Sequence, residues 1–144
     1  MYDGYMFKNK NGGFTLIELL VVISIIGILS YLLLANFVGV RQRGRDAERK
    51  SDLRQIQAAF ELYRADNGNY PTSLATCGSA FTANSVTYMQ KIPCDPLDKS
   101  NYHYSTADSG VTYSIYACLE NANDIDGTVN QSCTSGKSYS LTNP

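Results

Sequence analysis

The chain opens with a short polar segment that gives way to a long run of apolar residues. From Leu19 to Val40 there is no Asp, Glu, Lys or Arg, and the polar interruptions are Ser24, Ser30, Tyr31 and Asn36. A helix of this length, at about 1.5 Å per residue, covers the roughly 30 Å hydrocarbon core of a bilayer. We therefore expect residues 14–40 to form a membrane-spanning helix.

Beyond Val40 the pattern becomes periodic. Apolar residues recur at helical spacing among charged ones, at Leu53, Ile56, Ala59, Phe60 and Tyr63. This spacing predicts that the same helix continues as an amphipathic stem, residues 41–67. The stem is expected to end at Asp66-Asn67-Gly68, because glycine readily adopts the left-handed cap conformation and Pro71 follows closely.

Residues 68–144 are enough for one small head domain. The segment from Val111 to Leu119 alternates as a half-buried strand does, with Val111, Tyr113, Ile115, Ala117 and Leu119 on one face. Residues 101–105 and 137–141 are the expected partner strands. The predicted fold class is α+β: a long N-terminal helix whose second half carries a small antiparallel sheet of three or four strands.

Charge is distributed unevenly along a chain whose formal net charge is −1. The stem from Arg41 to Arg64 has a net charge of +3, and the residues from Ala65 onward have a net charge of −4. One explanation is a solvated helix face with local pairs such as Asp46 with Lys50 or Glu48 with Arg49. The other is that basic stems meet the acidic heads of adjacent subunits. The acidic head also argues against nonspecific nucleic-acid binding.

All the cysteines lie in the head: Cys77, Cys94, Cys118 and Cys133. Their wide spacing contains no Cys-x-x-Cys pair and the chain has a single histidine, which argues against zinc. We expect disulfides outside the cytoplasm, with free thiols in a reducing compartment as the alternative. Three connectivities remain open, and we favour the two short loops, Cys77 with Cys94 and Cys118 with Cys133.

The junction before the apolar run carries the strongest motif. An ordinary secretory signal has its cleavage site after the apolar run, but the residues there, Arg41 to Arg45, do not fit one. The string Gly13-Phe14-Thr15-Leu16-Ile17-Glu18 instead resembles the processing site of the type IV pilin and type II secretion pseudopilin superfamily.

This resemblance implies a specific maturation. A prepilin peptidase would remove residues 1–13 as a leader, whose start is Met1 or Met6, by cutting between Gly13 and Phe14. Phe14 would become the N-methylated terminus, and Glu18 would pair with the N-terminal amine of a neighbouring subunit. A lone carboxylate among apolar residues does favour a cationic partner. The alternative is that Glu18 lies among the lipid headgroups and needs none.

The head also resembles the major pseudopilin branch, through Leu62 to Pro71 and Lys91 to Pro96. In that branch a loop near the C-terminus binds calcium. The matching segment here supplies the candidate ligands Asn121, Asn123, Asp124 and Asp126. It does not fit an EF-hand, because Ala122 and Cys133 stand at ligand positions. A plain acidic turn without metal is the alternative.

The sequence offers no catalytic constellation, and His103 between two tyrosines fits a strand residue. We therefore expect a non-enzymatic, structural subunit of a type IV pilus-like filament. A pseudopilin of a type II secretion system is the alternative, followed by a membrane-anchored binding protein that does not polymerise. The resemblance implies three kinds of partner: copies of the chain, the prepilin peptidase, and an assembly platform with its ATPase. It also implies a single-pass cytoplasmic-membrane protein whose head lies outside the cytoplasm, and then a surface or periplasmic filament.

Overall fold

The computed structural model describes residues 13–143, without the side chains of residues 34–36. The leader residues 1–12, including both candidate starts Met1 and Met6, lie outside the described residues. The chain divides into two compact units, residues 1–38 and 39–144.

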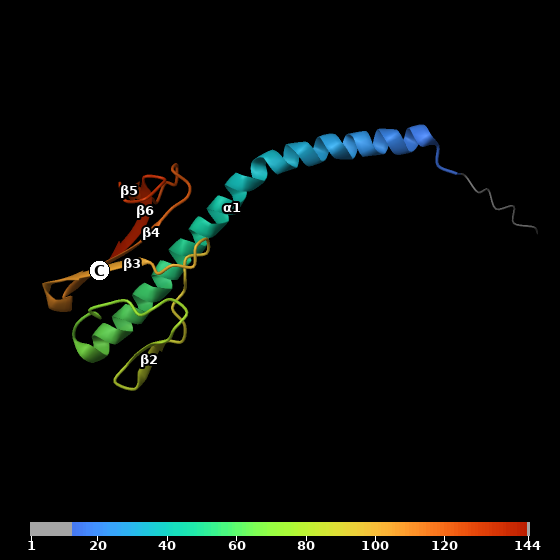
Figure 1. Ribbon diagram of the computed structural model, residues 1–144. Helices are drawn as coiled ribbons and strands as arrows, with labels where there is room; N and C mark the ends of the chain where they lie inside the picture. Colours follow the sequence, from blue (N-terminus) through green and yellow to red (C-terminus); the bar gives the residue numbers. More distant parts are fainter. Residues whose placement is uncertain (1–12, 144) are drawn as a thin grey trace, which may run out of the picture. The chain divides into compact units, whose positions relative to one another are not determined.

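One long helix, α1 (Leu16–Asn67), contributes to both units (Figure 1). It begins two residues after Phe14, because Thr15 is the capping residue that precedes its first turn. It ends where the sequence predicts. Gly68 has φ +83°, and its N–H donates to the Arg64 carbonyl at 2.8 Å, as in a left-handed C-terminal cap.

The second unit contains an antiparallel sheet of four strands in the order β3-β4-β6-β5. The strands are β3 (His103–Ala107), β4 (Thr112–Cys118), β5 (Thr128–Val129) and β6 (Lys137–Thr142). The short 3₁₀ turn η1 (Asp108–Gly110) joins β3 to β4. The α+β prediction is confirmed, and so are the three strands that the alternation and its expected partners indicated.

A second sheet was not predicted. It is a hairpin of β1 (Phe81–Ala83) and β2 (Val86–Met89), joined through Asn84 and Ser85. Both turn residues have positive φ, +50° and +64°, which suits the tight turn of a two-residue hairpin loop. Neither residue is glycine, so the usual sequence signal for such a turn is missing.

The core lies between the stem half of α1 and the inner face of the four-stranded sheet. Leu53, Ile56 and Phe60 are at most 1% exposed, as the helical spacing predicted. Aromatic rings surround Phe60, with the centroid of Tyr104 at 5.0 Å and that of Tyr113 at 5.3 Å. Each large side chain buried in this way stabilises the fold by roughly 1.5–3 kcal/mol.

One predicted core residue is misplaced. Val111 was expected on the buried face of the strand, but it is 53% exposed. It precedes β4 and belongs to the turn after η1, so the alternation of the strand does not extend to it. In the same turn, Gly110 accepts a hydrogen bond from the Tyr70 N–H at 2.8 Å. A Cβ at Gly110 would lie 2.8 Å from the Tyr70 carbonyl oxygen, so only glycine allows this close approach.

Candidate functional site

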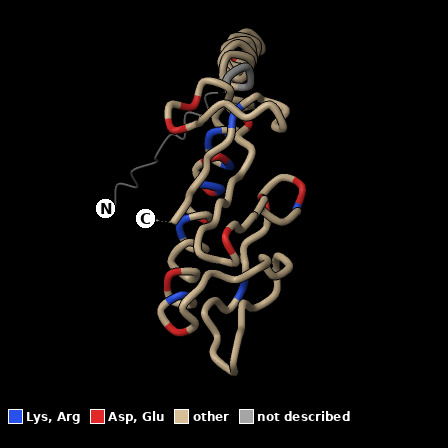
Figure 2. The backbone as a smooth tube through the Cα atoms, turned by 90° about the vertical axis from the view of Figure 1, so that its left-hand side faces the viewer, with Lys and Arg blue, Asp and Glu red and all other residues tan. Residues whose placement is uncertain are grey.

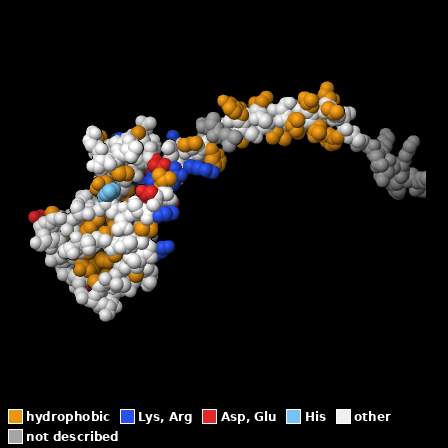
Figure 3. Space-filling view, in the orientation of Figure 1, with side chains coloured by type: hydrophobic (Ala, Val, Ile, Leu, Met, Phe, Trp, Pro, Cys, Tyr) orange, Lys and Arg blue, Asp and Glu red, His pale blue; other side chains and the backbone are white. Residues whose placement is uncertain are grey.

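The first unit presents an uncovered apolar helix. The segment Leu16–Leu33 is long and apolar enough to cross a membrane, and none of it is buried within the structure. Figure 3 shows hydrophobic side chains, in orange, along this part of α1. Since so much exposed aliphatic surface is unfavourable in water, the segment needs lipid or other protein around it.

The residues of the predicted processing site lie at the start of this helix. Gly13, Phe14 and Thr15 are in non-helical backbone, and Phe14 is 84% exposed. Thr15 and Glu18 form a reciprocal capping box. The Glu18 N–H donates to Thr15 Oγ1 at 3.3 Å, while Glu18 Oε2 accepts from the Thr15 N–H at 2.8 Å and from its hydroxyl at 2.7 Å. The structure thus places the carboxylate of Glu18 one turn from Phe14, on the same end of the helix.

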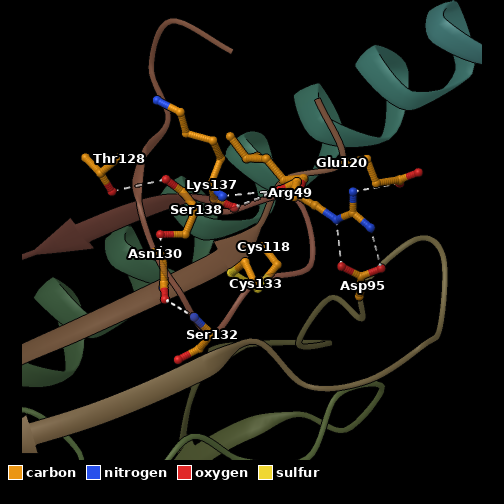
Figure 4. Close-up of a disulfide and its surroundings, with 12 residues drawn as sticks. Arg49, Asp95, Cys118, Glu120, Thr128, Asn130, Ser132, Cys133, Lys137 and Ser138 are labelled. Atoms are coloured by element: carbon orange, nitrogen blue, oxygen red, sulfur yellow. Dashed lines mark hydrogen bonds and ion pairs between the residues drawn. A yellow bond between two sulfur atoms is a disulfide. The ribbon is translucent and has the colours of Figure 1, made fainter. Parts of the chain in front are cut away.

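In the second unit, a cluster of charges centred on Arg49 joins the stem to the head. The Arg49 guanidinium binds Asp95 through both carboxylate oxygens, with Nε at 2.7 Å and Nη2 at 2.9 Å (Figure 4). Its Nη1 donates to Asp46 and to Glu120, each at 2.8 Å. Arg45 adds a two-point contact to Glu120, with both distances 2.6 Å. Bidentate arginine–carboxylate pairs are among the strongest charged hydrogen bonds in proteins.

This cluster is largely removed from solvent. The side chains of Asp46 and Arg49 are 1% and 4% exposed. Burial opposes the charge on Arg49, but hydrogen bonds from its carboxylate partners outweigh it and raise the pKa of Arg49. Burial likewise opposes the charge on Asp95, and the hydrogen bond from Arg49 overcomes it, so that the pKa of Asp95 is lowered. The hydrogen bond from Arg45 lowers the pKa of Glu120.

Asp46 also fixes the backbone of the head. Its two carboxylate oxygens accept from the N–H groups of Glu120 and Asn121, both at 2.9 Å. The loop that follows β4 is therefore attached to the stem through side chains and through its own backbone. A neighbouring buried contact is similar, because Tyr102 donates its hydroxyl to Asp52 at 2.7 Å. Neither contact was predicted, since the partners are 50 to 75 residues apart in the sequence.

These contacts correct the prediction of local pairs along the stem. Lys50 does not pair with Asp46. Its Nζ donates to Asp124 at 2.6 Å and to Asp126 at 2.8 Å, while Asp46 pairs with Arg49. Basic stem and acidic head do meet, but they meet within one chain. Figure 2 shows the corresponding acidic loop segments, in red, close to the basic turns of the stem, in blue.

The candidate calcium loop is arranged around the same lysine. Asp124 and Asp126 face the Lys50 ammonium, and its hydrogen bond lowers the pKa of Asp124. Asn121 and Asp124 each accept a backbone N–H two residues on, from Asn123 at 3.1 Å and Asp126 at 3.0 Å. In the part of the chain that the structure describes, no group of three or more His, Cys, Asp or Glu is arranged to hold a metal. In this arrangement the Lys50 ammonium pairs with both carboxylates, so a calcium ion would have to compete with it for them.

The cysteines form two disulfides, Cys77 with Cys94 and Cys118 with Cys133, which is the pairing favoured from the sequence. Each one constrains a carboxylate of the cluster. Cys94 directly precedes Asp95. The loop closed by Cys118 and Cys133 carries Glu120 (Figure 4), and it also carries the two aspartates that bind Lys50. The disulfides thus hold the head loops that contact the stem.

A cavity of about 520 Å³ lies beside this cluster in the second unit. Arg49, Asp95 and Glu120 border it, together with Tyr102, His103 and polar residues of the turn between β5 and β6. His103 stacks on Tyr116, with the ring centroids 4.5 Å apart, as a residue on the outer face of β3. The hydroxyl of Ser135, which also lines the cavity, donates to the Leu119 carbonyl and so serves the fold.

The chain matches two family models. "Prokaryotic N-terminal methylation motif" covers residues 8–31, and "Type II secretion system (T2SS), protein G" covers residues 36–132. The first includes the Gly13–Glu18 string and the second most of the stem and head. No solved structure gives a significant match.

Several curated relatives carry the name Type II secretion system core protein G. The relative from Escherichia coli is 33% identical over 98 residues, which cover 61% of this chain and 68% of that protein. The relative from Klebsiella michiganensis is 32% identical over 101 residues, covering 63% and 71%. The relative from Pseudomonas aeruginosa is 29% identical over 122 residues, covering 78% and 85%.

These similarities confirm the resemblance to the pilin and pseudopilin superfamily. They also favour the secretion alternative over the surface pilus that the sequence analysis put first. The relatives' names describe a core protein of a secretion system, in keeping with the expected structural role. With an N-terminal methylation motif followed by a model match over two thirds of its length, the chain belongs to the type II secretion system protein G family.

Proposed function

We propose that this chain is a pseudopilin, a structural subunit of the filament of a type II secretion system. The observation that carries the proposal is the protein G family match over residues 36–132, which follows the methylation motif of residues 8–31 in the same chain. The relatives' names support secretion rather than a surface pilus. In this role the chain contributes no catalysis and works by forming a filament with copies of itself.

Maturation follows from the N-terminal junction. A prepilin peptidase removes residues 1–13, and the new terminus on Phe14 is methylated. Support comes from the backbone, since Gly13 and Phe14 precede the helix and are exposed, as a protease substrate must be. Cleavage at this position keeps residues 14–40 as the membrane anchor, with residues 41–67 as the stem and residues 68–144 as the head.

Assembly uses the uncovered apolar helix. Its side chains are exposed to solvent in the isolated chain, so lipid must cover them first and neighbouring helices afterwards. Glu18 is the ionisable group within this surface, and a lone carboxylate inside a membrane costs about 2.5–3.5 kcal/mol or more. The amine that cleavage creates on Phe14 of a neighbouring copy is the cation that offsets this cost.

The proposed location of the head, outside the cytoplasm, is consistent with its two disulfides. The apolar helix anchors the chain in the cytoplasmic membrane with its head outside the cytoplasm, where two disulfides can form and persist. The assembly platform and its ATPase then draw subunits into the filament.

The test of the assembly step is Glu18→Ala. We expect the leader to be removed normally, seen as the loss of its mass in mass spectrometry, while cross-linked filament ladders and secretion are lost. Glu48→Ala is the matched control, because Glu48 is an exposed glutamate on the stem of the same helix. This variant should keep normal leader removal, filament ladders and secretion. Normal filaments from the Glu18 variant would remove the proposed amine pairing.

The test of the function as a whole is deletion of the gene. We expect secreted enzymes to accumulate in the periplasm while surface pili persist. Loss of surface pili with normal secretion would replace the proposal with the pilus subunit that the sequence analysis put first.

A further inference from the structure

The basic residues between Arg43 and Lys50 differ in their contacts. Arg45, Arg49 and Lys50 are each paired with head carboxylates of the same chain. Arg43, two residues before Arg45, is exposed and forms no ion pair among the described residues. Among the described residues, the head carboxylates therefore pair with Arg45, Arg49 and Lys50 but not with Arg43.

Arg43 and Lys50 also differ in their distance from the expected membrane surface. The uncharged run from Leu19 to Val40 is about 33 Å long as a helix, close to the roughly 30 Å of a hydrocarbon core. Arg43 lies at most about 4.5 Å beyond Val40 along the helix, within a headgroup layer roughly 5–7 Å thick. Lys50 lies up to about 15 Å beyond Val40, above the headgroups and beside the head loops.

We propose that Arg43 binds the phosphate groups of anionic phospholipids in the outer leaflet of the membrane that holds α1. A guanidinium is suited to this role, since its planar donors match two phosphate oxygens at once. The proposal also accounts for arginines on the outer side, where positive residues are otherwise disfavoured. It rests on the membrane orientation of the proposed function and not on filament formation.

The experiment measures lipid binding by the purified full chain in neutral detergent micelles, using native mass spectrometry. Phosphatidylglycerol is the anionic probe and phosphatidylcholine the zwitterionic one. We expect tighter binding of phosphatidylglycerol and a loss of about fivefold in its affinity for Arg43→Gln, the effect of one basic residue at a membrane surface. Lys91→Gln removes the same charge from an exposed site in the head and should bind like wild type.

The proposal would be overturned by equal binding of both lipids, by unchanged affinity in Arg43→Gln, or by an equal loss in Lys91→Gln. Inorganic phosphate at millimolar concentration should not displace the lipid, and displacement would assign the site to free phosphate instead. Arg43→Lys guards against a folding effect, because it keeps the charge and should retain most of the affinity. Normal filaments from the Glu18 variant, which would remove the proposed amine pairing, would leave this lipid-binding result unaffected.

Discussion

Removing Arg49 tests whether the charged cluster holds the head on the stem. In Arg49→Met the buried side chain keeps most of its apolar length but loses its contacts to three carboxylates, those of Asp46, Asp95 and Glu120. Because Asp46 is 1% exposed, it cannot recover these interactions from water. Breaking a buried ion pair by removing one partner costs about 3–5 kcal/mol, and we expect a loss of unfolding free energy in that range.

The assay is urea denaturation of the full chain in neutral detergent, followed by near-ultraviolet circular dichroism. Tyrosine supplies the signal, because the chain has no tryptophan and Tyr102 and Tyr113 are buried in the core. For a domain of this size the slope is about 1–3 kcal/mol per molar urea, so a loss of 4 kcal/mol lowers the midpoint by about 2 M. Arg45→Gln is the comparison, since its side chain is 27% exposed and its loss should lower the midpoint much less.

A double-mutant cycle separates the ion pair from general packing. Asp95→Asn should be costly in the wild-type chain but much less so in the Arg49→Met background, because its partner is already gone. An Arg49→Met midpoint within about 0.3 M of wild type would refute the reasoning, and so would additive effects of the two substitutions.

Three further predictions concern pH, the disulfides and metal. Ion pairs hold the pKa values of Asp95 and Glu120 below the usual range. Their contribution to stability is therefore complete above the unfolded-state pKa near 4 and is lost as pH falls through the lower folded-state values. Acid titration followed by circular dichroism should show this loss of stability. Replacing Cys118 and Cys133 by serine opens a 15-residue loop and should cost about 3 kcal/mol in urea denaturation; an unchanged midpoint would contradict this. A calcium chelator should leave the melting temperature unchanged, because Lys50 already pairs with both aspartates of the loop, and a clear decrease would support the calcium hypothesis.

Local patterns predicted most of the fold. The stem face, the end of the helix at Gly68 and the alternation of β4 each depend on residues a few positions apart, where periodicity and cap chemistry act directly. The hairpin of β1 and β2 was missed because its strands are short and its turn lacks glycine. β5 has only two residues and shows no alternation at all.

The charged cluster could not be predicted in the same way. The net charges of stem and head left two explanations open, local pairs along the stem or contacts between the stem and head of adjacent subunits, and neither was contact between stem and head within one chain. Arg49 and Asp95 are 46 residues apart, and Lys50 and Asp124 are 74 apart. Their pairing depends on how the sheet packs against the helix, which no local pattern contains. For the same reason the local pair of Asp46 with Lys50 was a reasonable prediction and a wrong one.

The internal pairing changes which charges are available to hold a filament together. Arg45, Arg49 and Lys50 already bind their own head, so using them between subunits would first require breaking buried or bidentate contacts. Glu18 lies on the uncovered helix and Arg43 at its outer end, and no ion pair to the head occupies either one among the described residues. In the proposed filament, a subunit therefore leaves the membrane with its head still bound to its stem, and the interactions that must be exchanged are those of the apolar helix and its two ends.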